Sequence, residues 1–211
     1  MAGELGAVVA LVLWLAGLVV TFGVRTWAHR RTTGSSGFRG LSGRPGSAPW
    51  WGGVLFGGAL VLTTAGLVLA VSGAVPSANV PAVAGWVGLA VAVVGFVGVV
   101  LAQSGMGTSW RIGVDPAERT ALVIGGLFTL ARNPIFSAMC MAVIGLVLMV
   151  PTVLTAAGLV CLVVAVQLQV RVIEEPHLLA VHGNAYAAYA ARVGRFVPGV
   201  GRLHATSQAV G

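Results

Sequence analysis

The stretch PIFSAMCMAVIGLVLMVPTVLTAAGLVCLVVAVQLQV, residues 134–170, contains no charged side chain and decides the fold class of this chain. It is 37 residues long, whereas a helix of about 20 residues already crosses the ~30 Å hydrocarbon core of a bilayer. Pro151 divides the stretch near its middle, where it interrupts helical hydrogen bonding. We therefore expect a helical hairpin, with helices over 134–150 and 152–172 that cross the membrane and return.

Three further apolar runs precede this hairpin, and each is long enough to span a bilayer. They cover roughly residues 5–24, 50–73 and 82–103. The first differs from a signal peptide because its only preceding charge is Glu4 and the basic residues follow it. Trp50 and Trp51 open the second run, as expected for an interfacial aromatic belt.

The composition and the placement of charge agree with a membrane protein. Of the 211 residues, 57% are hydrophobic and only 8% are charged, whereas soluble domains carry about 25% charged residues. All twelve basic residues are arginines, and they lie in the polar segments 25–49, 104–133 and 171–211. Excess positive charge marks the cytoplasmic side, so we expect the N-terminus outside and these segments in the cytoplasm of a bacterial inner or plasma membrane. Anionic lipid headgroups, not nucleic acid, are the partners that this charge predicts.

The predicted fold is all-α, a polytopic membrane helical bundle of about five transmembrane helices. The last two form the hairpin, and a cytoplasmic helical segment follows at the C-terminus. Within this single membrane domain, residues 1–103 hold three N-terminal spans with a basic cytoplasmic loop at 25–49, and residues 104–211 form the catalytic region. Cys140 and Cys161 both lie in apolar runs, which predicts helix packing and neither a disulfide nor a metal site.

Arg132-Asn133-Pro134 begins the hairpin and has the pattern of a helix start. Asn is a favoured N-cap residue, and Pro suits the first helical position. A helix N-terminus also binds anionic groups, but the motif taken alone favours a structural role, with Arg132 among the lipid headgroups.

Glu174-Glu175 is harder to explain structurally, because carboxylates at the membrane end of an apolar helix are costly unless paired or solvated. Arg171 precedes them by three and four residues and offers one pairing. Neighbouring helical positions point about 100° apart, so one carboxylate is expected to pair with Arg171 while the other faces a ligand. Pro176 predicts a break in the helix at Glu175.

A polar segment follows the glutamates and contains two pairs of residues at helical spacing. It includes His177, His182, Gly183, Tyr186, Tyr189, Arg192, Arg195 and Pro198. An interfacial amphipathic helix, with its tyrosines and arginines at headgroup level, accounts for this spacing. The two histidines lack a third ligand, so no metal site is expected. Gly105-Met106-Gly107, on the same side of the membrane, is a weak signal alone.

Together these motifs resemble the isoprenylcysteine carboxyl methyltransferase and phospholipid methyltransferase superfamily of membrane enzymes. That family carries Arg-His-Pro-x-Tyr at a helix start, a helical hairpin, Glu-Glu, Phe-Gly-x-x-Tyr-x-x-Tyr and Arg-Phe-x-Pro. The corresponding stretches here are Arg132-Asn133-Pro134-Ile135-Phe136, Glu174-Glu175, His182-Gly183-Asn184-Ala185-Tyr186-Ala187-Ala188-Tyr189 and Arg195-Phe196-Val197-Pro198. The resemblance covers roughly the C-terminal half of the chain.

The resemblance implies methyl transfer from S-adenosylmethionine, to a lipidic or prenylated-cysteine carboxyl acceptor, at the cytoplasmic face. It implies a cofactor site made by Gly105, Gly107, Asn133, Pro134, Glu174, Glu175, Tyr186 and Tyr189. It assigns catalytic roles to Arg132, Asn133 and Arg195. Two departures matter: Asn133 replaces the family histidine, and Phe136 replaces a frequent tyrosine. Because Asn cannot act as a general base near neutral pH, the acceptor stays open between a prenylated cysteine carboxylate, a phospholipid headgroup and a small thiol.

Two other classes remain open. Membrane sterol reductases have a similar C-terminal architecture, and Arg192 with Arg195 would suit the extra phosphate of NADPH. A non-catalytic membrane scaffold would tolerate loss of Glu174 without loss of ligand binding. Transport is less favoured, because transporters place ionisable groups within their spans, and these spans are almost free of charge.

Overall fold

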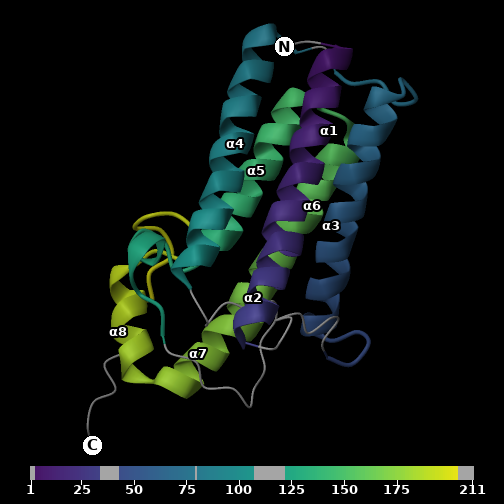
Figure 1. The fold of residues 1–211 in the computed structure, drawn as a ribbon. Coiled ribbons are helices and arrows are strands. Elements are labelled where there is room, and N and C mark those ends of the chain that lie inside the picture. Colours follow the sequence, from purple (N-terminus) through teal and green to yellow (C-terminus); the bar gives the residue numbers. More distant parts are fainter. Residues whose placement is uncertain (1–2, 34–42, 79, 107–121, 204–211) are drawn as a thin grey trace, which may run out of the picture.

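The computed structural model describes residues 3–33, 43–78, 80–106 and 122–203. Within these ranges the chain is helical, with turns and two isolated β-bridges and no strands (Figure 1). The elements are α1 (Glu4–Leu18), the π-helix η1 (Val19–Val24), α2 (Arg25–Thr33), α3 (Ala48–Val71), α4 (Ala82–Gly105), the 3-10 helix η3 (Gly126–Thr129), α5 (Pro134–Met149), α6 (Val153–Leu168), the π-helix η4 (Gln169–Glu174), α7 (Glu175–His182) and α8 (Asn184–Arg192).

Four continuous helical stretches are long and apolar enough to cross a membrane. They are Glu4–Ala28, Ala48–Val71, Ala82–Gly105 and Val153–His182. The fifth apolar helix, Pro134–Met149, has 16 residues and is therefore about 24 Å long. The predicted all-α membrane bundle is confirmed, with four long spans and one shorter helix, and the chain is an integral membrane protein.

The predicted hairpin is confirmed, and a capping box forms its turn. Helix α5 ends at Met149, and α6 begins after Thr152. The Oγ1 of Thr152 accepts a hydrogen bond from the backbone N–H of Thr155 at 3.1 Å, and the Oγ1 of Thr155 accepts from the N–H of Thr152 at 3.0 Å. These reciprocal bonds satisfy donors that a helix start otherwise leaves without partners.

The hairpin is flanked by two other spans, with α4 packed on α5 and α3 packed on α6, and α1 lies across them (Figure 1). Glycines allow the α4–α5 backbones to approach closely. A Cβ atom added at Gly95 would lie 2.4 Å from the backbone nitrogen of Ala142, and one at Gly145 would lie 2.3 Å from that of Ala92. Small residues promote this kind of helix association within lipid.

Helix α1 is fixed to its neighbours by buried polar contacts. The indole Nε1 of Trp14 donates to the hydroxyl of Thr64 in α3 at 2.8 Å, and the Trp14 ring lies 6.4 Å from that of Phe96 in α4. Near the opposite end of α1's span, the side-chain amide of Gln103 donates to the carbonyl of Thr21 at 3.2 Å. These bonds keep the first span against both halves of the bundle.

The predicted loop at 25–49 is wrong over its first part. Residues Arg25–Thr33 form α2, which continues the first span through the π-helical turn η1. Alanine and arginine are good helix formers, so the hydrogen-bond ladder of the span propagates past the membrane boundary. Residues 34–42 lie outside the described part of the chain. Helix α3 begins at Ala48, where the Ser47 hydroxyl accepts from the N–H of Trp50.

The predicted helix break at Glu175 is also wrong. The helix runs without interruption from Val153 to His182, and Glu175 has φ −61° and ψ −45°. Pro176 lies in the first turn of α7, directly after the π-helical segment η4. A π-type turn shifts the hydrogen-bond ladder, and the missing N–H of a proline costs least in a first turn. Pro176 is therefore accommodated without ending the helix.

The two ends of the bundle differ in charge. Glu4 lies at the end where α1 begins, whereas α2, α7 and α8 lie at the other end (Figure 1). The described arginines belong to this second end, because each lies in α2, before α3 or α5, or from η4 onward. Arg39, Arg111 and Arg119 lie outside the described residues.

Candidate functional site

A buried ion-pair cluster lies at the arginine-rich end, where the carboxylate of Glu175 binds two guanidinium groups. Arg195 binds it in a bidentate manner, with Nε 2.8 Å from Oε1 and Nη2 2.8 Å from Oε2. The Nη2 of Arg132 also donates to Oε1. The side chains of Arg132 and Glu175 are only 1% and 8% exposed, and that of Arg195 is 15% exposed. We call these three residues the Arg132–Glu175–Arg195 cluster.

Arg132 also binds backbone carbonyls in the C-terminal segment. Its Nη1 lies 2.8 Å from both the Ala190 and the Val193 carbonyl oxygens, and its Nη2 lies 3.2 Å from that of Gly201. Its Nε is buried without a hydrogen-bond partner in the described part of the chain. The expected position of Arg132 among lipid headgroups is therefore wrong, because its guanidinium fills the concave side of the turn after α8.

The segments before α5 and after α8 are joined by backbone pairing. The N–H of Arg132 donates to the carbonyl of Gly194 at 2.8 Å, and the N–H of Asn133 donates to that of Arg195 at 3.1 Å. The Asn133 side chain adds a further bond from Nδ2 to the Arg195 carbonyl at 3.1 Å. This pairing places the Arg-Asn-Pro and Arg-Phe-x-Pro motifs, 62 residues apart, beside each other.

Asn133 occupies the N-cap position of α5 as predicted, but its side chain makes no capping bond. Pro134 lies in the first helical turn, also as predicted. The side-chain amide of Asn133 is engaged with Arg195 instead. The hydroxyl of Ser137 approaches the same turn, 2.6 Å from the carbonyl oxygen of Phe196. The start of α5 thus holds the C-terminal turn in place.

A tight turn carries Arg195, and glycines shape its backbone. The N–H of Arg195 donates to the carbonyl of Val200 at 2.8 Å. A Cβ atom at Gly194 would lie 2.1 Å from the carbonyl oxygen of Val197, which no side chain permits. Gly201 has φ +72°, a backbone conformation that favours glycine.

Tyr186 and Tyr189 belong to a small second core, so the expected exposure of their side chains to lipid headgroups is wrong. Both are buried, with ring centroids 6.1 Å apart in an edge-to-face arrangement. The Tyr189 hydroxyl donates to the carbonyl of Phe128 at 2.6 Å. The rings pack against Leu122, Leu178, Val193 and Leu203. Burial raises the pKa of each tyrosine to about 12, and the charge of Glu175 adds to this shift for Tyr186.

Glu174 faces a different neighbour from Glu175, as their adjacent helical positions predict. Its Oε1 accepts a hydrogen bond from the Nε2 of Gln169 at 3.1 Å, and Glu174 is half-buried. The side chain of Gln169 reaches toward α3, where its Oε1 lies 4.0 Å from a Cβ atom added at Gly52. The expected pairing with Arg171 is wrong, because Arg171 donates to Gln167 at 2.7 Å.

The remaining predicted site residues are not brought into the cluster. Gly105 ends α4 and is exposed, with open space around it. Gly107 lies outside the described residues. No group of three or more His, Cys, Asp or Glu side chains that could hold a metal ion occurs in the described part of the chain. The free cysteines Cys140 and Cys161 are half-buried and pack against the core, as predicted.

Three contributors to this region were not predicted: Gly194, Ser137 and Gln169. Gln169 had a usable signal, because a polar side chain near the end of an otherwise apolar span is costly without a partner. Ser137 and Gly194 had none, because their importance depends on the turn that contacts them, and glycine is frequent throughout this chain.

Part of the chain matches a known protein family. Residues 83–185 match the family model described as Phospholipid methyltransferase. This region resembles the phospholipid methyltransferase family, and the match spans just under half of the chain. It runs from α4 to the start of α8 and includes Arg132 and both glutamates of the Glu174-Glu175 pair. No curated protein and no solved structure gave a match.

The phospholipid methyltransferase region does not include the whole site. Tyr186, Tyr189 and Arg195 lie just beyond its C-terminal end, and α1, α2 and α3 lie before it. The resemblance noted from the motifs is therefore confirmed at the level of the superfamily. The family match indicates a membrane methyltransferase.

Proposed function

We propose that this protein transfers a methyl group from S-adenosylmethionine to a lipidic or prenylated-cysteine carboxyl acceptor at the cytoplasmic face of the membrane. One observation carries the proposal: the phospholipid methyltransferase region includes the helices that bring Arg132, Glu174 and Glu175 to one end of a membrane bundle. The excess of arginine at that end supports a cytoplasmic location. The N-terminus then lies outside.

The side chains at this end fit the polar groups of S-adenosylmethionine. When bound, that cofactor would supply an electrophilic methyl group on a sulfonium, and it presents an ammonium, ribose hydroxyls and a carboxylate. Both oxygens of Glu175 already accept from arginines. Glu174 accepts one bond, from Gln169, among the described residues. We therefore assign to Glu174 the role of accepting hydrogen bonds from the ammonium or the ribose, because charge-assisted bonds of this kind are strong.

The Arg132–Glu175–Arg195 cluster supplies positive charge and a fixed framework. Two guanidinium groups against one carboxylate leave one net positive charge, which favours the cofactor's carboxylate. Hydrogen bonding to Glu175 raises the pKa of Arg195, so this charge persists at neutral pH. The buried Nε–H of Arg132, without a partner in the described part, is a further donor at the same place. We propose Arg132, Asn133 and Arg195 as the residues that shape the site.

The side chains present favour an acceptor that needs no general base. Asn133 cannot accept a proton near neutral pH, and its amide is engaged with Arg195. Tyr186 and Tyr189 have a pKa of about 12, so they stay protonated. Methyl transfer is an in-line displacement, in which positioning and exclusion of water supply much of the rate. A carboxylate or thiolate acceptor suits this set of residues better than an amine or a hydroxyl.

The reductase alternative depends on Arg192 and Arg195 as a phosphate-binding pair. Arg195 gives its Nε and Nη2 to Glu175, which leaves Arg192 as the exposed member of the pair. This arrangement favours methyl transfer over NADPH binding.

Calorimetric titration of the detergent-purified protein with S-adenosylmethionine tests the proposal, with NADPH titrated in parallel. We expect saturable binding of S-adenosylmethionine and a loss of affinity of about tenfold or more in Glu174→Gln, which removes a charged hydrogen-bond acceptor. Glu4→Gln is the matched control, since Glu4 lies at the other end of the bundle. A folded protein that binds NADPH alone would support the reductase, and one that binds neither nucleotide would support a scaffold.

A further inference from the structure

A glutamine at the end of α6 makes the hydrogen bond that fixes the Glu174 carboxylate. Gln169 is half-buried, and its Nε2 donates to the Oε1 of Glu174 at 3.1 Å. The Glu174 side chain has no other hydrogen bond in the described part of the chain. The direction of this carboxylate therefore depends on Gln169.

The π-helical turn η4 makes this bond possible. Gln169 and Glu174 are its first and last residues, five positions apart. In an α-helix, residues at that separation point about 140° apart, so their side chains do not meet. A π-helix closes its hydrogen bonds between residues five apart, which brings the two side chains onto one face. The turn that accommodates Pro176 thus also places the amide beside the carboxylate.

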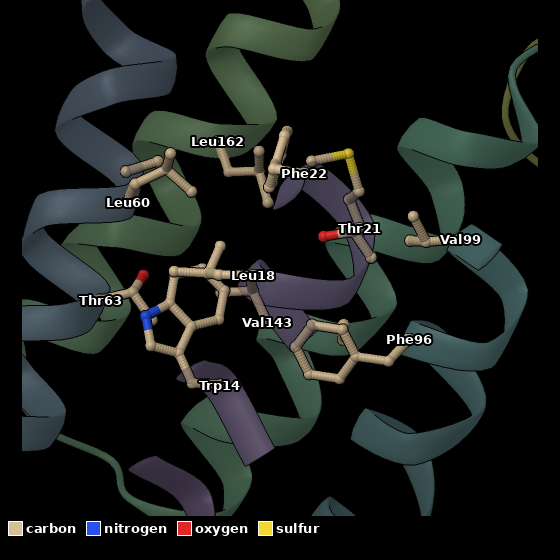
Figure 2. A pocket seen from close by; sticks show the side chains of 13 residues that line it. Trp14, Leu18, Thr21, Phe22, Leu60, Thr63, Phe96, Val99, Val143 and Leu162 are labelled. Atoms are coloured by element: carbon tan, nitrogen blue, oxygen red, sulfur yellow. The ribbon is translucent and has the colours of Figure 1, made fainter. Parts of the chain in front are cut away.

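Helix α3 forms a fixed surface along α6. A Cβ atom added at Gly158 in α6 would lie 2.5 Å from the Thr63 hydroxyl oxygen in α3, so the two helices pack closely there. One turn nearer the arginine-rich end, Leu60 and Leu162 line the same small apolar pocket from these two helices (Figure 2). Residue numbers fall along α3 as they rise along α6, so the two helices are antiparallel and keep one register.

The same register continues to Gln169, whose side chain reaches α3 at a glycine. Its Oε1 lies 4.0 Å from a Cβ atom added at Gly52, and η4 packs against α3. Gly52 is buried, and its lack of a side chain leaves room for the amide. The Gln169 amide therefore lies between α3 and Glu174, with its oxygen toward the helix and its nitrogen on the carboxylate.

We propose that Gln169 is a positioning residue for cofactor binding, which holds the Glu174 carboxylate in the direction that the ligand requires. The inference rests on the proposed function, in which Glu174 accepts hydrogen bonds from S-adenosylmethionine, and Gln169 acts through Glu174. A glutamate side chain is flexible, and ordering it before the ligand arrives lowers the entropic cost of binding. Helix α3, which precedes the phospholipid methyltransferase region, thereby contributes to the affinity for the cofactor.

Calorimetric titration with S-adenosylmethionine tests the inference through a double-mutant cycle. Gln169→Leu removes the amide donor, and we expect an affinity about fivefold lower than that of the wild type. In the Glu174→Gln background the same substitution should change the affinity by less than about twofold, because the carboxylate that Gln169 orients is already absent. Gln167→Leu is the matched control: Gln167 bonds Arg171 at 2.7 Å, and its loss should leave the affinity unchanged.

A second variant, Gln169→Asn, covers the case in which Gln169→Leu does not fold. It keeps the amide but shortens the side chain by one methylene, so we expect a similar loss of affinity. Equal losses from the Gln169 substitution in the wild-type and Glu174→Gln backgrounds would mean a general structural role and would overturn the inference. A wild type that does not bind the cofactor would overturn the proposed function together with this inference. A wild type that binds, is weakened by Glu174→Gln and is unaffected by Gln169→Leu would overturn the positioning role alone.

Discussion

Arg132 and Glu175, 43 residues apart in sequence, share a hydrogen bond from Nη2 to Oε1 in a site that solvent scarcely reaches. Arg132 begins the hairpin, and Glu175 lies beyond its second helix, so the bond joins the two ends of the hairpin at the arginine-rich end of the bundle. Arg195 adds the C-terminal turn to the same carboxylate. A charge removed from such a cluster leaves its partners buried without compensation.

Glu175→Gln should destabilise the protein strongly, because it leaves two buried guanidinium groups around a neutral amide. We expect a loss of about 3–5 kcal/mol in the free energy of unfolding, measured by denaturation in detergent. Glu4→Gln, at the other end of the bundle, should change stability by less than about 0.5 kcal/mol. Equal stability of the two variants would contradict a structural role for Glu175.

Gly194→Ala should disrupt the turn after α8, since its Cβ atom would lie 2.1 Å from the carbonyl oxygen of Val197. We expect a cost of about 1–3 kcal/mol, as for other overpacked sites, and faster proteolysis of the C-terminal segment. Gly58→Ala in α3 is the control, because a Cβ atom there meets nothing within 4 Å. Unchanged proteolysis of Gly194→Ala would show that the turn differs from this description.

Tyr189→Phe should cost about 0.5–1.5 kcal/mol of stability, because it removes the hydroxyl that donates to the Phe128 carbonyl. A thermal melt in detergent measures this loss. The buried ring should stay in place, so binding of S-adenosylmethionine by the folded variant should not change. A loss of cofactor affinity with unchanged stability would instead place the Tyr189 hydroxyl at the ligand.

Tyr186 and Tyr189 should make stability sensitive to alkali. Their pKa is raised to about 12 in the folded state from about 10 in an unfolded chain. The folded state therefore holds these protons more tightly, and the resulting stability is complete below about pH 10 and is lost as the pH rises toward 12. Tyr186→Phe should reduce this slope in unfolding measurements between those pH values. An identical slope in the variant would contradict the raised pKa of Tyr186.

Asn133→His tests the departure from the family motif. The Asn133 amide donates to the Arg195 carbonyl, and a histidine ring nitrogen is a donor that suits the same bond. We expect the variant to fold and, because histidine titrates near neutral pH, to extend methyl transfer to acceptors that lose a proton. Comparing thiol, carboxyl and amine acceptors with radiolabelled S-adenosylmethionine measures this change. An acceptor range unaffected by Asn133→His would show that this position does not handle a proton.

Several features were readable without a structure because they depend on local composition. A run of 37 uncharged residues divided by Pro151 has few alternatives to a hairpin. The divergence of Glu174 and Glu175 follows from helical geometry alone. The predicted helix break at Glu175 was wrong because it considered Pro176 alone. The π-helical turn before Pro176 accommodates the proline.

The ion pairs of the site could not be predicted from local composition. Arg171 is the arginine nearest to Glu175 in sequence, yet Glu175 binds Arg132 and Arg195, 43 and 20 residues away. Helical spacing reports neighbours within one helix and carries no information about which distant turn will fold onto it. The position of Tyr186 and Tyr189 was predicted wrongly for the same reason, because their helical spacing suits a membrane interface as well as a small core.

The sequence by itself determined that this chain spans a membrane, forms a hairpin and places its arginines at one end, because the cost of burying charge in lipid leaves no other arrangement. The tertiary structure alone decided which of the two carboxylates binds the arginines. That choice depends on the tight turn at Gly194, which carries Arg195 to Glu175 and leaves Glu174 bonded to Gln169. Long-range packing assigns the roles of two adjacent, chemically identical residues.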